Sequence, residues 1–486
     1  MHDPEVGHLP GHQRSLNVFV LAMLSTAVVI SLRNLPLTAE YGLSSIFYYI
    51  VAAIVFMIPY ALVSAELASG WPKAGGVFIW AREALGDRWG FFTIWMQWFH
   101  NMTWYPAMLA FIASAIAYVF DPSLATNKIY LLTVILVGFW GITFLNFFGI
   151  KTSAWMSTIC VIIGAILPGL ILICLGAWWV ITGRPLSISV RPIDLLPDFD
   201  VSSFVFLAGI FLALAGLEAN ANLAREVKNP QKNYPRAIFA AAIITLSILI
   251  LGSLAIAIVI PQQEISLVSG LLDAFRSFFA MYNLSWMVPV IAIFTALGAL
   301  GELNAWAIAG VKGLFVTTEH GCLPPIFHKL NKHHTPVNLM LFQAIVVTIA
   351  AFVFLFLPNI NISYWILNAL AAQMYIIMYI FLLISGIVLR YKKPHVHRTY
   401  KVPFGNTGMW IAVVVGVLAS LFTLAFSFAP PVFRFIVESN LAYEILLIGG
   451  LVLSCLIPIA IYSFRKPHWK LEILDAIRDD IHHSTH

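Results

Sequence analysis

Apolar stretches of about twenty residues or more fill almost the whole chain, and the charged residues lie in the gaps between them. A helix of about twenty apolar residues is long enough to cross the hydrocarbon core of a bilayer. Hydropathy predicts about twelve such helices, at residues 16–35, 43–68, 89–120, 129–148, 154–181, 201–223, 234–260, 285–316, 336–357, 362–391, 409–428 and 441–464. The pattern therefore predicts an all-helical protein that crosses a membrane many times.

Composition supports this class and excludes others. Apolar residues make up 60% of the chain and charged residues 10%, against about 45–50% and about 25% in soluble domains. The chain contains no phosphate-binding glycine loop, no G-x-S-x-G motif and no H-E-x-x-H motif. We therefore expect no enzyme, no nucleotide-driven pump, no cofactor and no metal site.

The basic residues predict the orientation. With a cytoplasmic N-terminus, 21 of the 27 Lys and Arg residues fall in inner segments. The six expected outside are Arg33, Lys128, Arg184, Arg191, Arg276 and Arg434. Inner loops of membrane proteins carry an excess of Lys and Arg, so both termini are expected in the cytoplasm. The net charge of +5 then reflects contact with the lipid bilayer and requires no nucleic-acid partner.

Two spans contain residues that favour an interrupted helix. Residues 24–28 form a small, hydroxyl-bearing patch in the first span, and residues 213–222 of the sixth combine a glycine, a glutamate and two asparagines. Interruptions at equivalent places in two halves are typical of inverted-repeat transporters. The two halves would be residues 16–182 and 201–391, and two further helices would follow within 409–464. A cytoplasmic segment at 1–15 would precede this transporter domain, and a cytoplasmic tail at 465–486 would follow it. Close helix packing is the alternative interpretation of the first patch.

Interrupted helices would provide a site for a zwitterion. Exposed N–H groups at a helix N-terminus bind carboxylates, and exposed carbonyl groups at a C-terminus bind ammonium groups. An α-amino acid carries both groups, so a pair of opposed interruptions would bind it at its two ends. The substrate-binding residues expected on this basis are Ser25, Thr26, Ala27, Val28, Ala213, Ala215, Gly216 and Asn220.

Several motifs resemble the amino acid–polyamine–organocation transporter superfamily. They are G-L-E-A at 216–219 with N-P at 229–230 and Pro235, A-E-L-A at 65–68 followed by Pro72, Gly75-Gly76 and Trp80, and G-E-L-N-A-W at 301–306. The strings W-P-K-A-G-G-V-F at 71–78 and V-I-P-Q-Q-E-I at 259–265 are similar to the bacterial glutamate/GABA antiporter branch.

This resemblance implies a LeuT-type fold of two inverted five-helix repeats with two trailing helices, and discontinuous first and sixth helices. It also implies amino-acid exchange or proton-linked uptake at a bacterial inner membrane. One departure concerns the first helix, where many members have glycines and this chain has Ser25, Thr26 and Ala27.

Two midspan carboxylates and two aromatic residues are the remaining candidates. Charge at midspan is costly, so Glu218 and Glu302 are expected to act as gating or proton-linked groups, or as helix-bonding carboxylates. Trp306 lies one helical turn after Glu302 and is expected to form an aromatic wall of the substrate site, unless it only packs. Tyr105 is expected to close over the substrate, with an interfacial aromatic belt as the alternative.

The sequence thus predicts a secondary amino-acid antiporter with pH-dependent activity. A proton- or sodium-coupled symporter and a non-transporting amino-acid sensor are the alternatives. An acidic substrate would need a cationic partner, and no Lys or Arg is placed at midspan by hydropathy. A substrate that is neutral at the transport pH is therefore the expectation.

Overall fold

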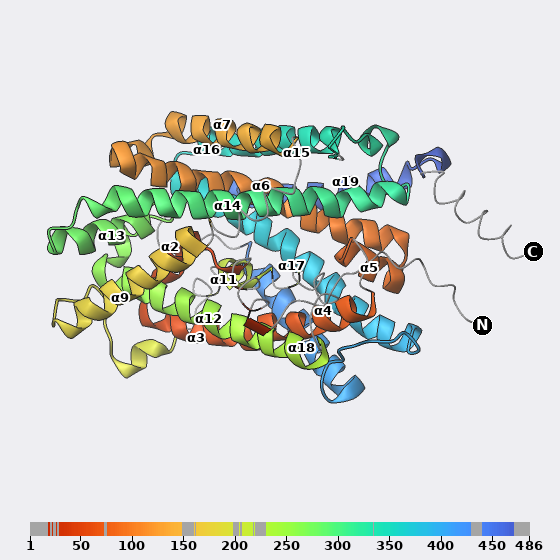
Figure 1. The fold of residues 1–486 in the computed structure, drawn as a ribbon, viewed down its shortest axis with the longest axis horizontal. Helices are drawn as coiled ribbons and strands as arrows, with labels where there is room; N and C mark the ends of the chain where they lie inside the picture. The colour runs from red at the N-terminus through yellow and green to blue at the C-terminus, as the bar shows by residue number, and fades with distance from the viewer. Residues whose placement is uncertain are drawn as a thin grey trace, which may run out of the picture.

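The computed structural model describes residues 18–19, 22, 26, 29–71, 75–147, 160, 162–197, 204, 207–216, 218, 230–333, 335–428 and 440–470. The regular elements within these ranges are all helices, and the ranges contain no strand. Figure 1 shows the long helices running along the long axis of the molecule. Helices satisfy their own backbone hydrogen bonds, which lipid cannot do for them.

The elements of the first half are η1 (Leu32–Asn34), α2 (Leu35–Ala39), η2 (Gly42–Ser44), α3 (Ser45–Ala52), η3 (Ala53–Met57), α4 (Ile58–Gly70), α5 (Val77–Leu85), α6 (Asp87–Phe120), η4 (Pro122–Thr126), α7 (Lys128–Asn146), η5 (Ile162–Ile166), α9 (Leu167–Ile181) and η6 (Pro192–Leu195). Those of the second half are α11 (Leu207–Leu214), α12 (Pro230–Val259), η8 (Gln262–Glu264), α13 (Gly270–Met281), α14 (Met287–Glu319), η9 (Pro325–His328), α15 (Val337–Ala351), α16 (Val353–Phe356), α17 (Ile360–Lys392), α18 (Gly405–Phe426), α19 (Asn440–Ser463) and η10 (Pro467–Trp469).

Ten helices within the described residues are long and apolar enough to cross a membrane. They correspond to ten of the spans expected from hydropathy, all except the first and the sixth. Much of those two spans lies outside the described residues, which there contain η1 with α2 and α11, and isolated helical residues before each of them.

Helix α6 lies at the centre of the bundle. It packs against α14, α17, α5 and α7, and 83% of its most apolar window is buried, against 17% for the span Tyr443–Ser463 in α19. On the far side of α14, Gly164 of η5 meets Gly298. A Cβ atom built on Gly164 would lie 2.3 Å from the Cα atom of Gly298. Only two glycines permit this approach, and it places α14 between η5 and α6.

Among the described residues of the first span, Ile30 and Ser31 are not helical, whereas the predicted interruption at residues 24–28 lies outside the described residues except for Thr26. Thr26 and Val29 are helical, and the Ile30 N–H donates to the Thr26 carbonyl oxygen at 2.8 Å. Ser31 is extended, with φ −132° and ψ 111°, before η1 begins. Pro36 explains the position: it has no N–H to donate to the carbonyl of residue 32, and it is tolerated in the first turn of the new helix, α2.

In the sixth span, α11 ends at Leu214, and Ala215 and Gly216 are not helical. Gly216 has a φ of +115°, a conformation that glycine adopts without steric cost. Two tyrosines satisfy the backbone here. The hydroxyl of Tyr379 accepts from the Gly216 N–H at 3.0 Å, and the hydroxyl of Tyr60 donates to the Leu214 carbonyl oxygen.

A buried ion cluster joins α4 to α17 and to the segment after it. The Glu66 carboxylate contacts Arg390 at 2.5 Å and Arg398 at 3.4 Å, and it accepts from the Val402 N–H at 2.7 Å. Both oxygens of this buried carboxylate therefore have partners. The cluster therefore links the segment after α17, which contains Arg398 and Val402, to α4.

We predict that Glu66→Gln destabilises the protein by about 3–5 kcal/mol, because it leaves two buried guanidinium groups without their counter-charge. The apparent melting temperature of purified protein in detergent measures the effect. Glu83→Gln is the matched control, because its ion pair with Lys393 is partly exposed and such pairs contribute about 1 kcal/mol or less. Equal losses for the two variants would contradict the prediction.

Candidate functional site

A cavity lies at the centre of the bundle beside the two interruptions, and we call it the central cavity. It is lined by Val29, Ser31, Arg33, Asn34, His100, Trp104, Leu212, Ala215, Glu302, Trp306 and Tyr375. These residues come from both interrupted spans and from α6, α14 and α17. Its volume is about 30 Å³, which accommodates a water molecule but not an amino acid. A larger ligand therefore requires the lining side chains or helices to move apart.

Arg33 lines the central cavity and corrects the expectation that it lies in an outer loop. The residue is 2% exposed. Its Nη1 atom donates to the Asn368 Oδ1 atom at 2.8 Å and to the Tyr364 hydroxyl at 3.0 Å. The guanidinium carbon lies 5.1 Å from the centre of the Trp104 ring, a cation–π distance. A cationic group is thus present in the interior of the bundle.

Glu302 and Trp306 of α14 both line the central cavity, as expected for residues one helical turn apart. Glu302 is 7% exposed. No ion pair joins it to Arg33 within 4.0 Å, and none of the ion pairs among the described residues includes either group. The cavity therefore has one cationic and one acidic side chain that do not neutralise each other by direct contact.

Aromatic rings enclose the space between these charges. The His100 ring lies 4.1 Å from the Tyr375 ring and 6.1 Å from the Trp306 ring, measured between centroids. Trp104 and Tyr375 each lie 6.4 Å from Trp306. The Nδ1 atom of His100 donates to the Gln97 carbonyl oxygen at 2.5 Å, since a carbonyl oxygen only accepts. This bond fixes the orientation of the imidazole in the wall.

Glu218 lies one side chain behind the central cavity and does not line it. It is 2% exposed. Its carboxylate accepts from the Tyr375 hydroxyl and, at 2.6 Å, from the Tyr379 hydroxyl. Tyr375 lines the cavity, and Tyr379 also holds the Gly216 N–H. Glu218 is therefore connected to the cavity and to the interruption of the sixth span through these two tyrosines.

Comparison with known proteins places the chain in a family. A family model described as "Amino acid permease" matches residues 16–451. The chain belongs to the amino acid permease family. The match covers most of the described helices and agrees with a multi-pass membrane protein that is a transporter and not an enzyme.

Three relatives of the permease have informative names. An uncharacterized transporter of Legionella pneumophila is 44% identical over 94% of this chain and 97% of its own length. A glutamate/gamma-aminobutyrate antiporter of Lactococcus lactis is 32% identical over 93% of this chain and 91% of its own. A protein of Lactococcus lactis named "Probable agmatine/putrescine antiporter" is 25% identical over 79% of this chain and 82% of its own.

Of the other expected site residues of the permease, one lines the central cavity, and the rest lie away from it or outside the described residues. Ala215 lines the cavity, whereas Ala213 and Gly216 are buried next to it. Thr26 is buried, and its hydroxyl donates to the Ala22 carbonyl oxygen at 2.9 Å. The expected residues outside the described part of the chain are Ser25, Ala27, Val28 and Asn220.

Tyr105 does not line the central cavity of the permease. It is fully buried on another side of α6, with its ring 5.1 Å from the Phe139 ring of α7. The preceding residue, Trp104, lines the cavity instead. Consecutive helical residues point about 100° apart because a helix has 3.6 residues per turn. The structure therefore assigns the position at the cavity wall to Trp104 rather than to Tyr105.

Sequence reasoning missed Arg33, Asn34, Ser31 and Tyr375 as lining residues. Pro36 was the available signal for the first three, because a proline there favours a helix start a few residues earlier, in the middle of the span. Hydropathy alone ended the span at residue 35 and left Arg33 at its outer end. Tyr375 carries no local signal, since tyrosines are common in membrane helices.

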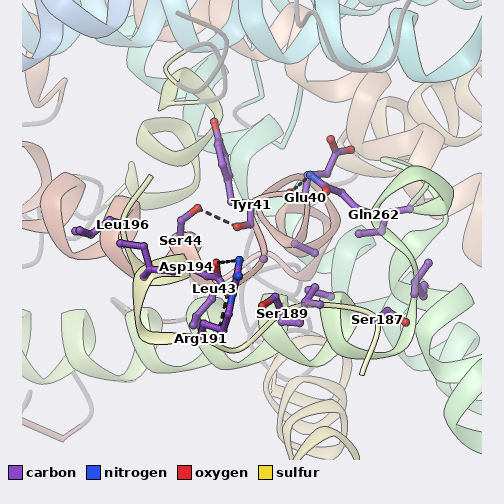
Figure 2. A pocket seen from close by; sticks show the side chains of 17 residues that line it. Glu40, Tyr41, Leu43, Ser44, Ser187, Ser189, Arg191, Asp194, Leu196 and Gln262 are labelled. Atoms are coloured by element: carbon purple, nitrogen blue, oxygen red, sulfur yellow. Dashed lines mark hydrogen bonds and ion pairs between the residues drawn. The ribbon is translucent and has the colours of Figure 1, made fainter. Parts of the chain in front are cut away.

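A second, larger cavity of about 500 Å³ lies between the turn after α2 and the segment that contains η6. Figure 2 shows Arg191 and Asp194 joined there by dashed lines, with Tyr41 and Ser44 on the facing segment. The two charges lie 3.1 Å apart, and hydrogen bonds from Arg191 and Ser189 lower the pKa of Asp194 to about 2. The pair neutralises itself, in contrast to Arg33 and Glu302.

We predict that Tyr379→Phe destabilises the permease by about 1–3 kcal/mol, because it removes the buried hydroxyl that bonds both the Gly216 N–H and one Glu218 oxygen. Thermal unfolding in detergent measures the loss. Tyr391→Phe is the control, since that exposed hydroxyl only accepts from the Trp410 indole N–H at 3.1 Å. A Tyr379→Phe melting temperature equal to that of the control would contradict the prediction.

Proposed function

We propose that this permease is a secondary amino-acid transporter that works by alternating access as an antiporter. It exchanges an amino acid for another amino acid or for the amine made from it. The proposal includes twelve spans in a LeuT-type arrangement of two inverted five-helix repeats and two trailing helices. It also includes a bacterial inner membrane as the location, with both termini in the cytoplasm.

The central cavity is the observation that carries this proposal. It places Arg33 and Glu302, of opposite charge and both buried, beside the ends of two short helices. An amino acid carries one ammonium and one carboxylate group, so it complements both charges at once. Aromatic rings from α6, α14 and α17 surround this pair, and low local polarity strengthens each interaction.

Alternating access is supported by the size and position of the cavity. It is too small for an amino acid as it stands, and it lies among side chains of at least five helical elements. Access from either side therefore requires the interrupted spans to move relative to α6 and α14. Transporters with interrupted helices move one group of helices against another around a fixed midplane site.

Exchange is favoured over ion-coupled uptake by the relatives. Two of them are named antiporters, one for glutamate and gamma-aminobutyrate and one for agmatine and putrescine. Both names describe exchange of a compound for its decarboxylated or shortened product. The arrangement of Arg33 and Glu302 is compatible with a symporter or a sensor as well, so flux measurements decide among the three.

The first test is counterflow in proteoliposomes. Vesicles loaded with unlabelled glutamate should take up labelled glutamate faster than empty vesicles do, because an antiporter returns to the outer side only when loaded. The readout is the initial rate of uptake with and without internal substrate, across a panel of amino acids.

Two results would contradict exchange. Equal rates into loaded and empty vesicles, with stimulation by an imposed proton or sodium gradient, would assign a symporter. Saturable binding of an amino acid by the purified protein without any flux would assign a sensor.

We predict that Glu218→Gln flattens the pH dependence of transport. The substitution removes a titratable group that contacts the cavity wall through Tyr375, while it keeps the side-chain size and one acceptor oxygen. Initial exchange rates from about pH 4 to about pH 8 measure the profile. Glu264→Gln, at an exposed position of η8, is the control and should keep the profile of the unchanged protein. An unaltered profile for Glu218→Gln would remove its proton-linked role.

A further inference from the structure

We propose that Arg33 binds a carboxylate of the transported substrate, so that this permease carries only compounds that keep a carboxylate and rejects plain amines. The inference rests on the proposed function and narrows its substrates: an amine is exchanged only where it keeps a carboxylate, as gamma-aminobutyrate does. It replaces the sequence-based expectation that the site contains no cationic partner.

The partners of Arg33 are the first argument. A buried guanidinium without a counter-charge is costly, and native proteins normally pair it with a carboxylate. Arg33 contacts only neutral groups in the described structure: Tyr364, Asn368 and the Trp104 ring. Its Nε atom is buried and has no hydrogen-bond partner. The guanidinium therefore keeps both its charge and a donor for an anion.

The surroundings of Arg33 hold it in place from one side. Tyr364 and Asn368 line a smaller cavity of about 10 Å³, which Arg33 shares with the central one. Both partners belong to α17 and lie one helical turn apart. Their contacts fix the guanidinium in orientation without neutralising it. A guanidinium that is fixed in orientation but keeps its charge is preorganised to bind an anionic ligand.

Glu302 supplies the second argument, because it lines the same cavity with the opposite charge. A substrate with one carboxylate and one ammonium group matches Arg33 and Glu302 together. A diamine such as putrescine or a guanidino-amine such as agmatine has no carboxylate, so one of its positive charges would lie near Arg33 uncompensated. Like charges inside a cavity of low polarity repel strongly. Glutamate and gamma-aminobutyrate both satisfy the requirement, since decarboxylation of glutamate leaves one carboxylate in place.

The test measures binding to the purified full-length protein in detergent. The probes are glutamate, gamma-aminobutyrate, agmatine and putrescine, titrated at one pH by calorimetry. The unchanged protein should bind the first two at least about 10-fold more tightly than the last two. Arg33→Gln should weaken glutamate and gamma-aminobutyrate about 10- to 100-fold, the loss of a charge-assisted hydrogen bond. It should leave the amines unaffected or bound more tightly.

Two further variants separate selectivity from folding. Arg33→Lys keeps the charge but loses the planar fork, so its selectivity should be intermediate. Arg184→Gln removes an exposed arginine after α9 and should behave as the unchanged protein. A purely structural Arg33 would lower the melting temperature of Arg33→Gln and change all four affinities by the same factor. That result would overturn the proposal, as would tight putrescine binding by the unchanged protein.

The binding measurements test the role of Arg33 separately from the proposed exchange, because they do not require transport. Carboxylate-selective binding that depends on Arg33, in a protein that shows no counterflow, would support this inference and refute the proposed exchange. Counterflow by the unchanged protein would support the proposed exchange. If the Arg33→Gln variant then still bound glutamate more tightly than putrescine, the role of Arg33 in selectivity would be refuted. If Arg33→Gln does not fold, the four affinities of the unchanged protein and of Arg33→Lys decide.

Discussion

Every backbone N–H and carbonyl group within the membrane must find a partner inside the protein, because lipid offers none. The ten long helices among the described residues meet this requirement through the hydrogen bonds of their own interiors. The two interrupted spans do not, and other side chains complete their bonding: Tyr60 at the Leu214 carbonyl and Tyr379 at the Gly216 N–H. In the described part of the chain, the irregular backbone of these two spans lies at the centre of the bundle, where α3, α17 and α18 pack against α11. The central cavity lies at the same place.

Buried charges divide into two kinds in this permease. Glu66 has two arginines and a backbone N–H around its carboxylate, so it is satisfied without a ligand and joins helices. Among the residues that the structure describes, Arg33 and Glu302 have no such counter-charge within 4.0 Å. Burying an unpaired charge costs folding free energy, and a membrane protein that retains such a charge normally uses it for binding or transport. The difference in partners, and not the difference in burial, separates the structural carboxylate from the candidate site.

Tyr375 connects Glu218 to the wall of the central cavity. Its ring forms part of the cavity wall beside His100, and its hydroxyl donates to Glu218. A change at Glu218 would alter this hydrogen bond and hence the wall that a substrate contacts. Through Tyr379, the same carboxylate is linked to the backbone of the sixth span. The cavity wall, a titratable group and the backbone of the sixth span thus share one small hydrogen-bond network.

The sequence alone determined the class, ten of the spans and the common face of Glu302 and Trp306, because hydropathy and the 3.6-residue period are local properties. It did not place Arg33, since a hydropathy window averages over its neighbours, and the partners that hold this arginine inside lie 331 and 335 positions away. Nor did it choose Trp104 over Tyr105, because the rotation of α6 is set by its packing against α14 and α17. Tertiary structure decided these points, since the burial of a charge depends on which distant groups meet it.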